Sequence, residues 1–233
     1  MRSSIFLTAC LLSASGLISA STIAGVCSTG FTNSTCTTLA GTTGSSHDGN
    51  FSLVSTPSSS TPTSPFVTET GQFPFTGTPS WVADSSVSEW ISPKGAETSS
   101  DGSGNYVYTE SFTLGSALDP ATASIIGQWT TDNSGFIELN GVQIGNGTIA
   151  PGTLQAFASF TSFSITSGFH TGLNTLTFVV NNNTNGTPDV TGLNVQILST
   201  NVSSAVPEPA TFAVMGLGLA AIGFFGRKLR SKV

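Results

Sequence analysis

The sequence has very little charge, and only a third of its charged residues are positive. Charged residues make up 8% of the chain, whereas soluble domains average about a quarter. The six basic residues are Arg2, Lys94, Arg227, Lys228, Arg230 and Lys232. Nucleic-acid binding needs lysines and arginines that displace counterions from phosphates. The scarcity of cations therefore excludes a nucleic-acid-binding function.

The charges that remain are distributed unevenly. Five of the six basic residues stand at the two ends of the chain, so the body between residues 25 and 206 keeps only Lys94. The same body carries eleven acidic residues, which gives it a net charge of about −10. Glycine, serine, threonine and asparagine take over the surface role. A surface that stays soluble through hydroxyls and amides favours a protein outside the cytoplasm.

Histidine is also scarce, and the usual hydrolase motifs are missing. His47 and His170 are the two histidines, and neither a Gly-x-Ser-x-Gly elbow nor a His-Glu-x-x-His motif occurs. Asp132 and Glu138 are the best candidates for a carboxylate pair. Glu138 alternates with apolar residues in a predicted strand, which favours a solvated outer face. The sequence therefore predicts a protein that is not an enzyme.

Residues 1–24 have the pattern of a secretory signal peptide, which we expect to form a helix. Arg2 supplies the positive charge, and an apolar stretch from Ile5 to Ile18 follows. Small residues allow cleavage after Ala20 or after Ala24, and both sites stay open. Residues 7–10 are similar to a lipoprotein cleavage box, but the apolar stretch continues past them, so we expect no lipidation there.

The C-terminal end predicts a transmembrane helix. Thr211 to Gly226 is sixteen residues without a charge. Such a helix is roughly 24 Å long, somewhat short of a hydrocarbon core of about 30 Å. The basic tail that follows contains Arg227, Lys228, Arg230 and Lys232. Because cytoplasmic flanks retain lysine and arginine, we expect the tail inside the cell and the body outside.

A rigid tetrapeptide, Val206-Pro207-Glu208-Pro209, stands directly before that helix. Its two prolines disfavour helix and keep it extended. The motif, the glycine-containing apolar helix and the basic end together resemble the PEP-CTERM sorting signal over residues 206–233. The resemblance implies processing by an exosortase, a membrane-embedded cysteine protease of Gram-negative bacteria that make exopolysaccharide. The alternative is an ordinary single-span anchor in which Pro-Glu-Pro is accidental.

Two cysteines remain in the body, Cys27 and Cys36, with eight residues between them. In an oxidising compartment this pair predicts a disulfide. Two free thiols or half of a metal site are the alternatives. No second cysteine pair exists and the two histidines are isolated, so we expect no zinc site.

The pattern of the body predicts β-structure. Residues 55–65 are rich in serine, threonine and proline and predict a loop. The predicted strands cover residues 106–114, 124–130, 136–139, 142–144, 156–165, 174–181 and 193–198. Asn140-Gly141 predicts a hairpin turn. With no long amphipathic helix in sight, we expect one all-β domain over residues 25–205, a single antiparallel β-sandwich.

Three segments of the body also resemble a galactose-binding-like jelly roll. They are Tyr106 to Phe112, Trp129 to Gly141 and Gly172 to Val180. The resemblance covers about residues 100–200. It implies a jelly-roll fold and leaves the activity open, because this fold hosts many unrelated functions.

Tryptophans with polar neighbours are the candidate ligand-binding residues. Sugar rings stack on exposed indole faces, and nearby Asp or Asn side chains bind the hydroxyls. This chemistry points to Trp81, Trp129, Asp132 and Asn133. Core packing is the competing interpretation for Trp90 and Trp129, which lie in apolar strands.

Residues 101–105, Asp-Gly-Ser-Gly-Asn, place oxygen ligands at alternate positions, as in a calcium loop. Tyr106 and Phe112 stand where such a loop has glycine and glutamate, so a flexible turn is the simpler interpretation. We expect no cofactor, and a structural calcium ion is the alternative.

These patterns predict an exported, surface or extracellular-matrix protein associated with exopolysaccharide or biofilm. The expected partners are the secretion machinery, an exosortase, the inner membrane before processing and exopolysaccharide. A carbohydrate-binding module is the leading hypothesis for the body. A passive adhesive protein of the matrix and a polysaccharide-remodelling enzyme are the alternatives.

Overall fold

The computed structural model describes residues 20–96, 101–153, 156–183, 189–205, 216–220 and 222. Residues Ala20–Ala205 form one compact unit. Most of the predicted signal peptide, the sorting motif and the basic tail lie outside the described residues. Residues 216–220 and 222 are helical. Among the residues described, no helix combines the length and the apolar character needed to cross a membrane.

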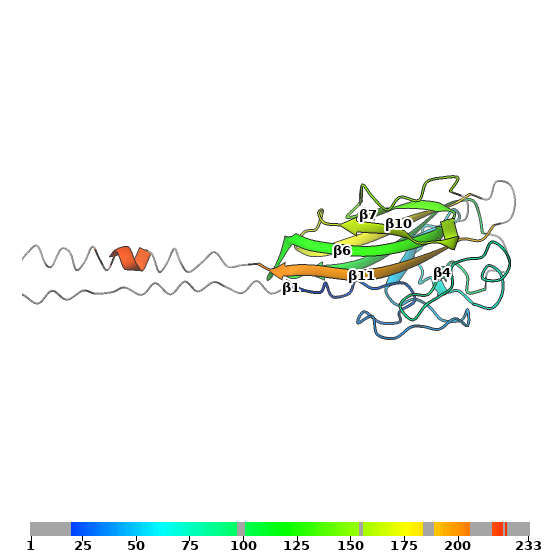
Figure 1. The fold of residues 1–233 in the computed structure, drawn as a ribbon, viewed down its shortest axis with the longest axis horizontal. Helices are drawn as coiled ribbons and strands as arrows, with labels where there is room; N and C mark the ends of the chain where they lie inside the picture. Colours follow the sequence, from blue (N-terminus) through cyan, green and yellow to red (C-terminus); the bar gives the residue numbers. More distant parts are fainter. Residues whose placement is uncertain are drawn as a thin grey trace, which may run out of the picture. The chain divides into compact units, whose positions relative to one another are not determined.

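The compact unit is a sandwich of two antiparallel sheets, which confirms the predicted fold class (Figure 1). One sheet has the order β3-β4-β11-β6-β9, and β1 also pairs with β11. Its strands are β1 (Ala20–Ser21), β3 (Phe66–Val67), β4 (Ile91–Ser92), β6 (Leu118–Asp132), β9 (Thr161–Ile165) and β11 (Gly192–Ser204). We call it the six-stranded sheet.

The second sheet, which we call the five-stranded sheet, has the order β2-β5-β10-β7-β8. Its strands are β2 (Phe51–Ser55), β5 (Gly104–Leu114), β7 (Ser134–Leu139), β8 (Val142–Gln143) and β10 (Gly172–Asn182). The pairing of β10 with β5 runs without a break from Gly172↔Leu114 to Asn182↔Gly104. This long regular ladder fixes which side chains of both strands face inward.

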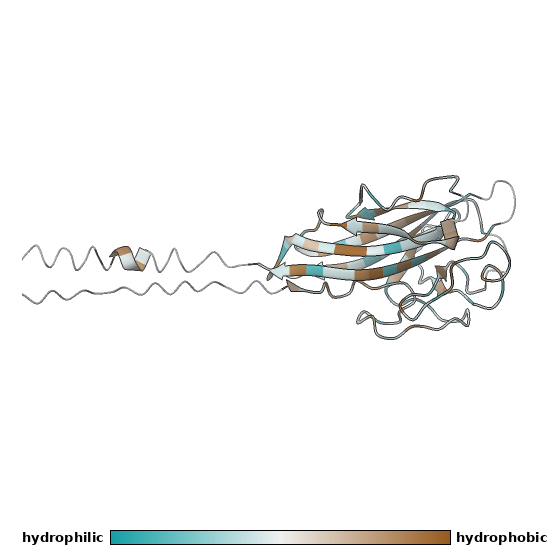
Figure 2. Cartoon of the chain, in the orientation of Figure 1, coloured by the Kyte–Doolittle hydropathy of each residue, from teal (hydrophilic) through white to brown (hydrophobic). Residues whose placement is uncertain are grey.

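Alternation explains how the strands build the core. In β5, Tyr106, Tyr108, Glu110, Phe112 and Leu114 are buried, while the residues between them are exposed or half-buried. Figure 2 shows the matching bands of apolar and polar residues along β6 and β11. Successive side chains of a strand point to opposite faces, so each sheet turns one apolar face toward the other. The main core fills the space between them.

The Asn140-Gly141 turn confirms the predicted hairpin. It joins β7 to β8, which pair through Glu138↔Gln143 and Leu139↔Val142. Both turn residues have positive φ, 54° at Asn140 and 77° at Gly141. Only asparagine and glycine adopt this conformation at low energetic cost, which is why the pair marks a two-residue turn.

The structure differs from the predicted strands at several places. The predicted strand 156–165 begins as a 3-10 helix, η1 (Ala156–Ala158), and only its second half is a strand. Strand β11 runs on to Ser204, past a register shift between Ile197 and Ser199 that interrupts the alternation. The loop predicted at 55–65 folds back on β2, because Leu53 and Thr63 exchange backbone hydrogen bonds.

Candidate functional site

A layer of loop covers the outer face of the six-stranded sheet near the start of β11. It is built on a small second core of Trp81, Trp90 and Val190, with Phe75, Val82 and Phe157 packed against it. The rings of Trp81 and Trp90 are stacked with their centroids 4.1 Å apart. Gly192 allows this close packing, since a Cβ there would lie 2.5 Å from the indole of Trp81.

Asp132, at the end of β6, fastens this loop layer to the sheet. Its Oδ2 accepts a hydrogen bond of 2.9 Å from the indole Nε1 of Trp81, and its Oδ1 accepts one of 2.6 Å from Asn133 Nδ2. Burial raises the pKa of Asp132 to about 7; the Trp81 hydrogen bond opposes the rise, and the nearby Asp189 adds to it. The carboxyl group therefore changes charge near neutral pH.

A second carboxyl group holds the other tryptophan. Asp84 Oδ1 accepts a hydrogen bond of 2.7 Å from the backbone N–H of Trp90. Burial raises the pKa of Asp84 to about 7; this hydrogen bond lowers it, and Glu89 raises it further. Nothing local in the sequence marks Asp84, because its environment is assembled from the loop and the sheet.

Polar side chains continue beyond Asp132 along the same end of the sandwich. Asn133 Nδ2 also lies 3.2 Å from Asp189 Oδ2. The backbone of Asp101 forms an isolated β-bridge with that of Asp189. The side-chain Oδ2 of Asp101 accepts a hydrogen bond from the backbone N–H of Thr191. Asp101 Oδ1 lies 2.8 Å from Lys94 Nζ. These oxygens are thus engaged within the protein.

The segment 101–105, considered above as a calcium loop, is part of this network. Asp101 forms the bridge to Asp189, and β5 begins at Gly104. No three His, Cys, Asp or Glu side chains of the described residues are grouped so that they could hold a metal ion.

An open hollow of about 530 Å³ lies on the outside of the loop layer. We call it the Trp81 hollow. It is lined by Phe75, Gly77, Thr78, Pro79, Ser80, Trp81, Val82, Ala83 and Ala158. The lining contains two aromatic rings and two hydroxyl groups and no charged side chain. This surface suits a neutral ligand with apolar and hydroxyl-bearing faces.

The structure brings three of the four predicted ligand-binding residues together and separates the fourth. Trp81, Asp132 and Asn133 are linked by hydrogen bonds. Trp129 is 0% exposed in the main core, where its Nε1 donates to Gly147 O. Trp81 is only 3% exposed, so it forms a wall of the hollow rather than an open platform. Neither indole offers the exposed face on which the prediction depended.

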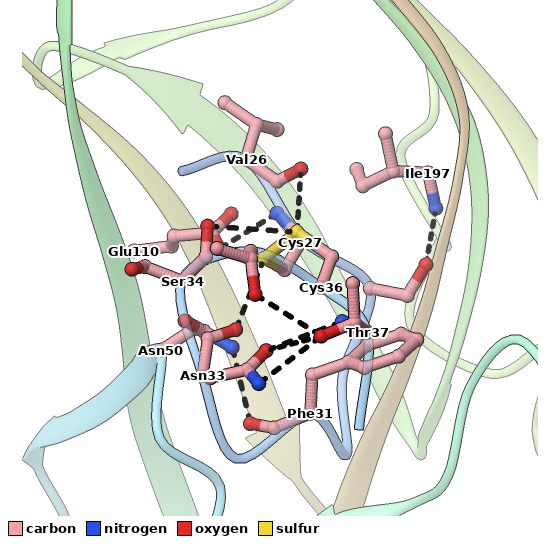
Figure 3. Close-up of a disulfide and its surroundings, with 12 residues drawn as sticks. Val26, Cys27, Phe31, Asn33, Ser34, Cys36, Thr37, Asn50, Glu110 and Ile197 are labelled. Atoms are coloured by element: carbon pink, nitrogen blue, oxygen red, sulfur yellow. Dashed lines mark hydrogen bonds between the residues drawn. A yellow bond between two sulfur atoms is a disulfide. The ribbon is translucent and has the colours of Figure 1, made fainter. Parts of the chain in front are cut away.

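The predicted disulfide joins Cys27 to Cys36, whose Cα atoms are 5.4 Å apart (Figure 3). Glu110 lies beside it and accepts a hydrogen bond of 2.8 Å from Cys27 N. Asn33, inside the disulfide loop, donates through its Nδ2 to the hydroxyl of Thr37, which follows Cys36, and its Oδ1 accepts from the backbone N–H of Thr37. The loop is therefore closed by a covalent bond, by local hydrogen bonds and by a buried carboxyl group.

Glu110 belongs to a group of three buried carboxyl groups with Asp48 and Glu89. Asp48 accepts hydrogen bonds from the backbone of Gly30, Asn50 and Phe51. Burial raises the pKa values of all three groups, backbone hydrogen bonds oppose the rise, and Asp48 raises the values of the other two further. These side chains hold the segment from residue 27 to residue 51 onto the sandwich.

The two carboxylates considered for catalysis belong to different sheets. Asp132 ends β6 of the six-stranded sheet, and Glu138 lies in β7 of the five-stranded sheet. Of the two histidines, His47 packs on Phe66 with ring centroids 4.1 Å apart, and its Nδ1 lies 3.0 Å from Ser64 O.

Comparisons with known proteins give one family match and two solved structures. CBM35 from Paenibacillus barcinonensis has 13% identity and a TM-score of 0.26, over 55% of this chain and 84% of its own. A family 35 carbohydrate-binding module from an environmental isolate has 12% identity and a TM-score of 0.26, over 60% of this chain and 88% of its own. No curated protein matches the chain.

The family match concerns the C-terminal end. Residues 205–230 match the PEP-CTERM protein-sorting motif. The predicted sorting residues Val206, Pro207, Glu208 and Pro209 fall inside this match, as do Arg227, Lys228 and Arg230; Lys232 follows it. The chain therefore carries a PEP-CTERM protein-sorting motif at its C-terminal end.

Proposed function

We propose that this chain is an exported protein that an exosortase processes at the membrane and delivers to the cell surface or the extracellular matrix. There its β-sandwich has a non-enzymatic role among exopolysaccharides. The sorting motif at residues 205–230 carries the proposal. Two features of the body support it: the Cys27–Cys36 disulfide, which persists in oxidising compartments, and the nearly cation-free surface.

The test of delivery is the mass of the native protein in its host, with and without the exosortase gene. With the protease present, we expect a chain that lacks the residues after the cut in the sorting motif. Without it, the C-terminal segment stays attached. Pro207→Ala combined with Glu208→Ala produces the uncut form in the normal host. Equal masses in both hosts would remove the proposal.

The role in the matrix is proposed as the binding of a neutral polysaccharide at the Trp81 hollow. The support is the chemistry of its lining: the ring of Phe75, the small exposed part of Trp81, the hydroxyls of Thr78 and Ser80, and no charge. Sugar rings present apolar C–H faces and hydroxyl edges, which such a surface matches.

Affinity electrophoresis in gels that contain the host's own exopolysaccharide tests this binding. We expect retardation of the wild type and its loss in Phe75→Ala. Phe73→Ala is the matched control, because Phe73 is 56% exposed and does not line the hollow. Equal migration with and without polymer would reject binding. Self-association without polymer would favour the passive adhesive protein, and release of sugar would favour the remodelling enzyme.

A further inference from the structure

The first described residues of the chain are part of the sandwich. Strand β1 (Ala20–Ser21) pairs antiparallel with the end of β11, through Ala20↔Ser203 and Ser21↔Val202. The hydroxyl of Ser21 donates to Val202 O at 3.3 Å. These residues lie close to the boundary at which the signal peptide is expected to end.

The residues after β1 enter the main core. Ile23 is 3% exposed and belongs to that core. Its backbone N–H donates to Thr200 Oγ1 at 2.9 Å, and Thr200 is itself buried. Val26 is buried three residues later. Ala24, between them, is exposed and makes no comparable contribution.

These contacts discriminate between the two cleavage sites that the sequence leaves open. Removal of residues 1–24 would delete β1 and Ile23, which leaves a space in the core and takes away the donor to Thr200. Removal of residues 1–20 keeps Ser21, Ile23 and their contacts with β11. Both sites end in alanine, the small residue expected directly before the cut; the third residue before the cut is Ile18 at the first site and Thr22 at the second.

We infer that the signal peptidase cuts between Ala20 and Ser21, so that the mature chain begins at Ser21. The inference rests on the proposed export. Hydrolysis adds one water across the peptide bond, which leaves a carboxylate on Ala20 and a free amino group on Ser21. The new amino terminus lies next to Val202 and Ser203 of β11.

The compact unit also ends close to this strand pair, directly before the sorting motif in the sequence. Strand β11 ends at Ser204, and the backbone N–H of Ala205 still donates to Ala117 O at 2.8 Å. The sorting motif begins at the next residue, Val206. The folded body thus uses nearly every residue between the two processing sites.

The test is the sequence of the amino terminus of the full chain after export from a bacterial host. We expect Ser21 as the first residue. A protein that starts at Gly25 would overturn the inference and leave the proposed export intact. A protein that keeps residue 1 would overturn the proposed export itself.

Two pairs of variants test the inference in further ways, besides the sequence of the wild-type amino terminus. Ala20→Phe should leave the precursor uncut, whereas Ala24→Phe, at an exposed position, should still give Ser21; the opposite pattern would refute the inference. Ile23→Ala should lower the denaturant midpoint of the purified mature protein, with Ala24→Ser as the control. If the mature chain began at Gly25, Ile23→Ala could not change that midpoint.

Discussion

Replacement of Glu110 by glutamine tests how the body holds an unpaired carboxyl group in its core. Glu110 Oε1 accepts from Cys27 N, while Oε2 is buried with no hydrogen-bond partner among the described residues. Burial raises its pKa well above the ordinary 4.5; the Cys27 hydrogen bond lowers it, and Asp48 raises it further. The folded protein therefore binds a proton that the unfolded chain releases.

The sign of the effect follows from that difference in bound protons. Above pH 4.5, the unfolded chain loses the proton of Glu110 while the folded protein keeps it. The free energy of unfolding is therefore highest below pH 4.5 and falls as the pH rises toward the folded pKa. The fall is about 1 kcal/mol for each pH unit. Because the folded pKa lies well above 4.5, Glu110 should make the protein less stable at pH 7 than at pH 5.

Glu110→Gln keeps the acceptor for Cys27 and cannot ionise. At pH 5 we expect the two proteins to be similar in stability, because the protonated carboxyl group of the wild type and the amide group of the variant are both neutral and both leave one buried polar atom without a partner. The variant should gain stability relative to the wild type as the pH rises from 5 to 7, because only the wild type loses stability through Glu110.

Urea unfolding at pH 5, 6 and 7, followed by tryptophan fluorescence, measures how the free energy of unfolding changes with pH in the wild type and in Glu110→Gln. Glu138→Gln is the matched control, since it removes a glutamate from the same sheet at a position that is not buried. We expect it to retain the pH slope of the wild type. If Glu110→Gln and wild type lose stability in parallel from pH 5 to pH 7, the buried proton is not at Glu110 and the reasoning fails.

Three further sets of variants test the disulfide and the packing. Cys27→Ser with Cys36→Ser should lower the free energy of unfolding by about 2–3 kcal/mol, as expected for a short closed loop; an unchanged urea midpoint would contradict this. Trp81→Phe should cost about 1–3 kcal/mol at neutral pH, because the donor to Asp132 is lost; Asp132→Asn in the same background should recover part of it. Gly192→Ala should lower the melting temperature, since its Cβ would press on the Trp81 indole; an unchanged melting curve would contradict the packing.

Local chemistry made part of the fold predictable. The Asn140-Gly141 turn requires positive φ at both positions, and few residue pairs other than Asn-Gly supply it. Strand β5 alternates between buried and less buried residues from Tyr106 to Leu114, long enough for the period to show. The disulfide followed from two cysteines close in sequence. In each case the residues that gave the prediction are the same residues that form the predicted structure.

The rest of the fold depends on partners far along the chain. Strand β4 has two residues, too few for a period, and exists because Ile91 pairs with Leu193. Trp81 is buried because Gly192 lacks a side chain, which no pattern around Trp81 reveals. Glu110 was not predicted to be buried, although its place in β5 between Tyr108 and Phe112 is a local signal for an inward side chain.

The pairing of Ala20 with Ser203 has a consequence for the topology of the body. Its two ends meet at one corner, so a short linker between residues 20 and 205 would turn the chain into a ring without moving a strand. New ends opened at the tip of the 55–65 segment, where Thr56 pairs with Ser59, would give a circular permutant with the same sheets. Because its two ends lie close together, the body can also be inserted as a domain into a surface loop of another protein.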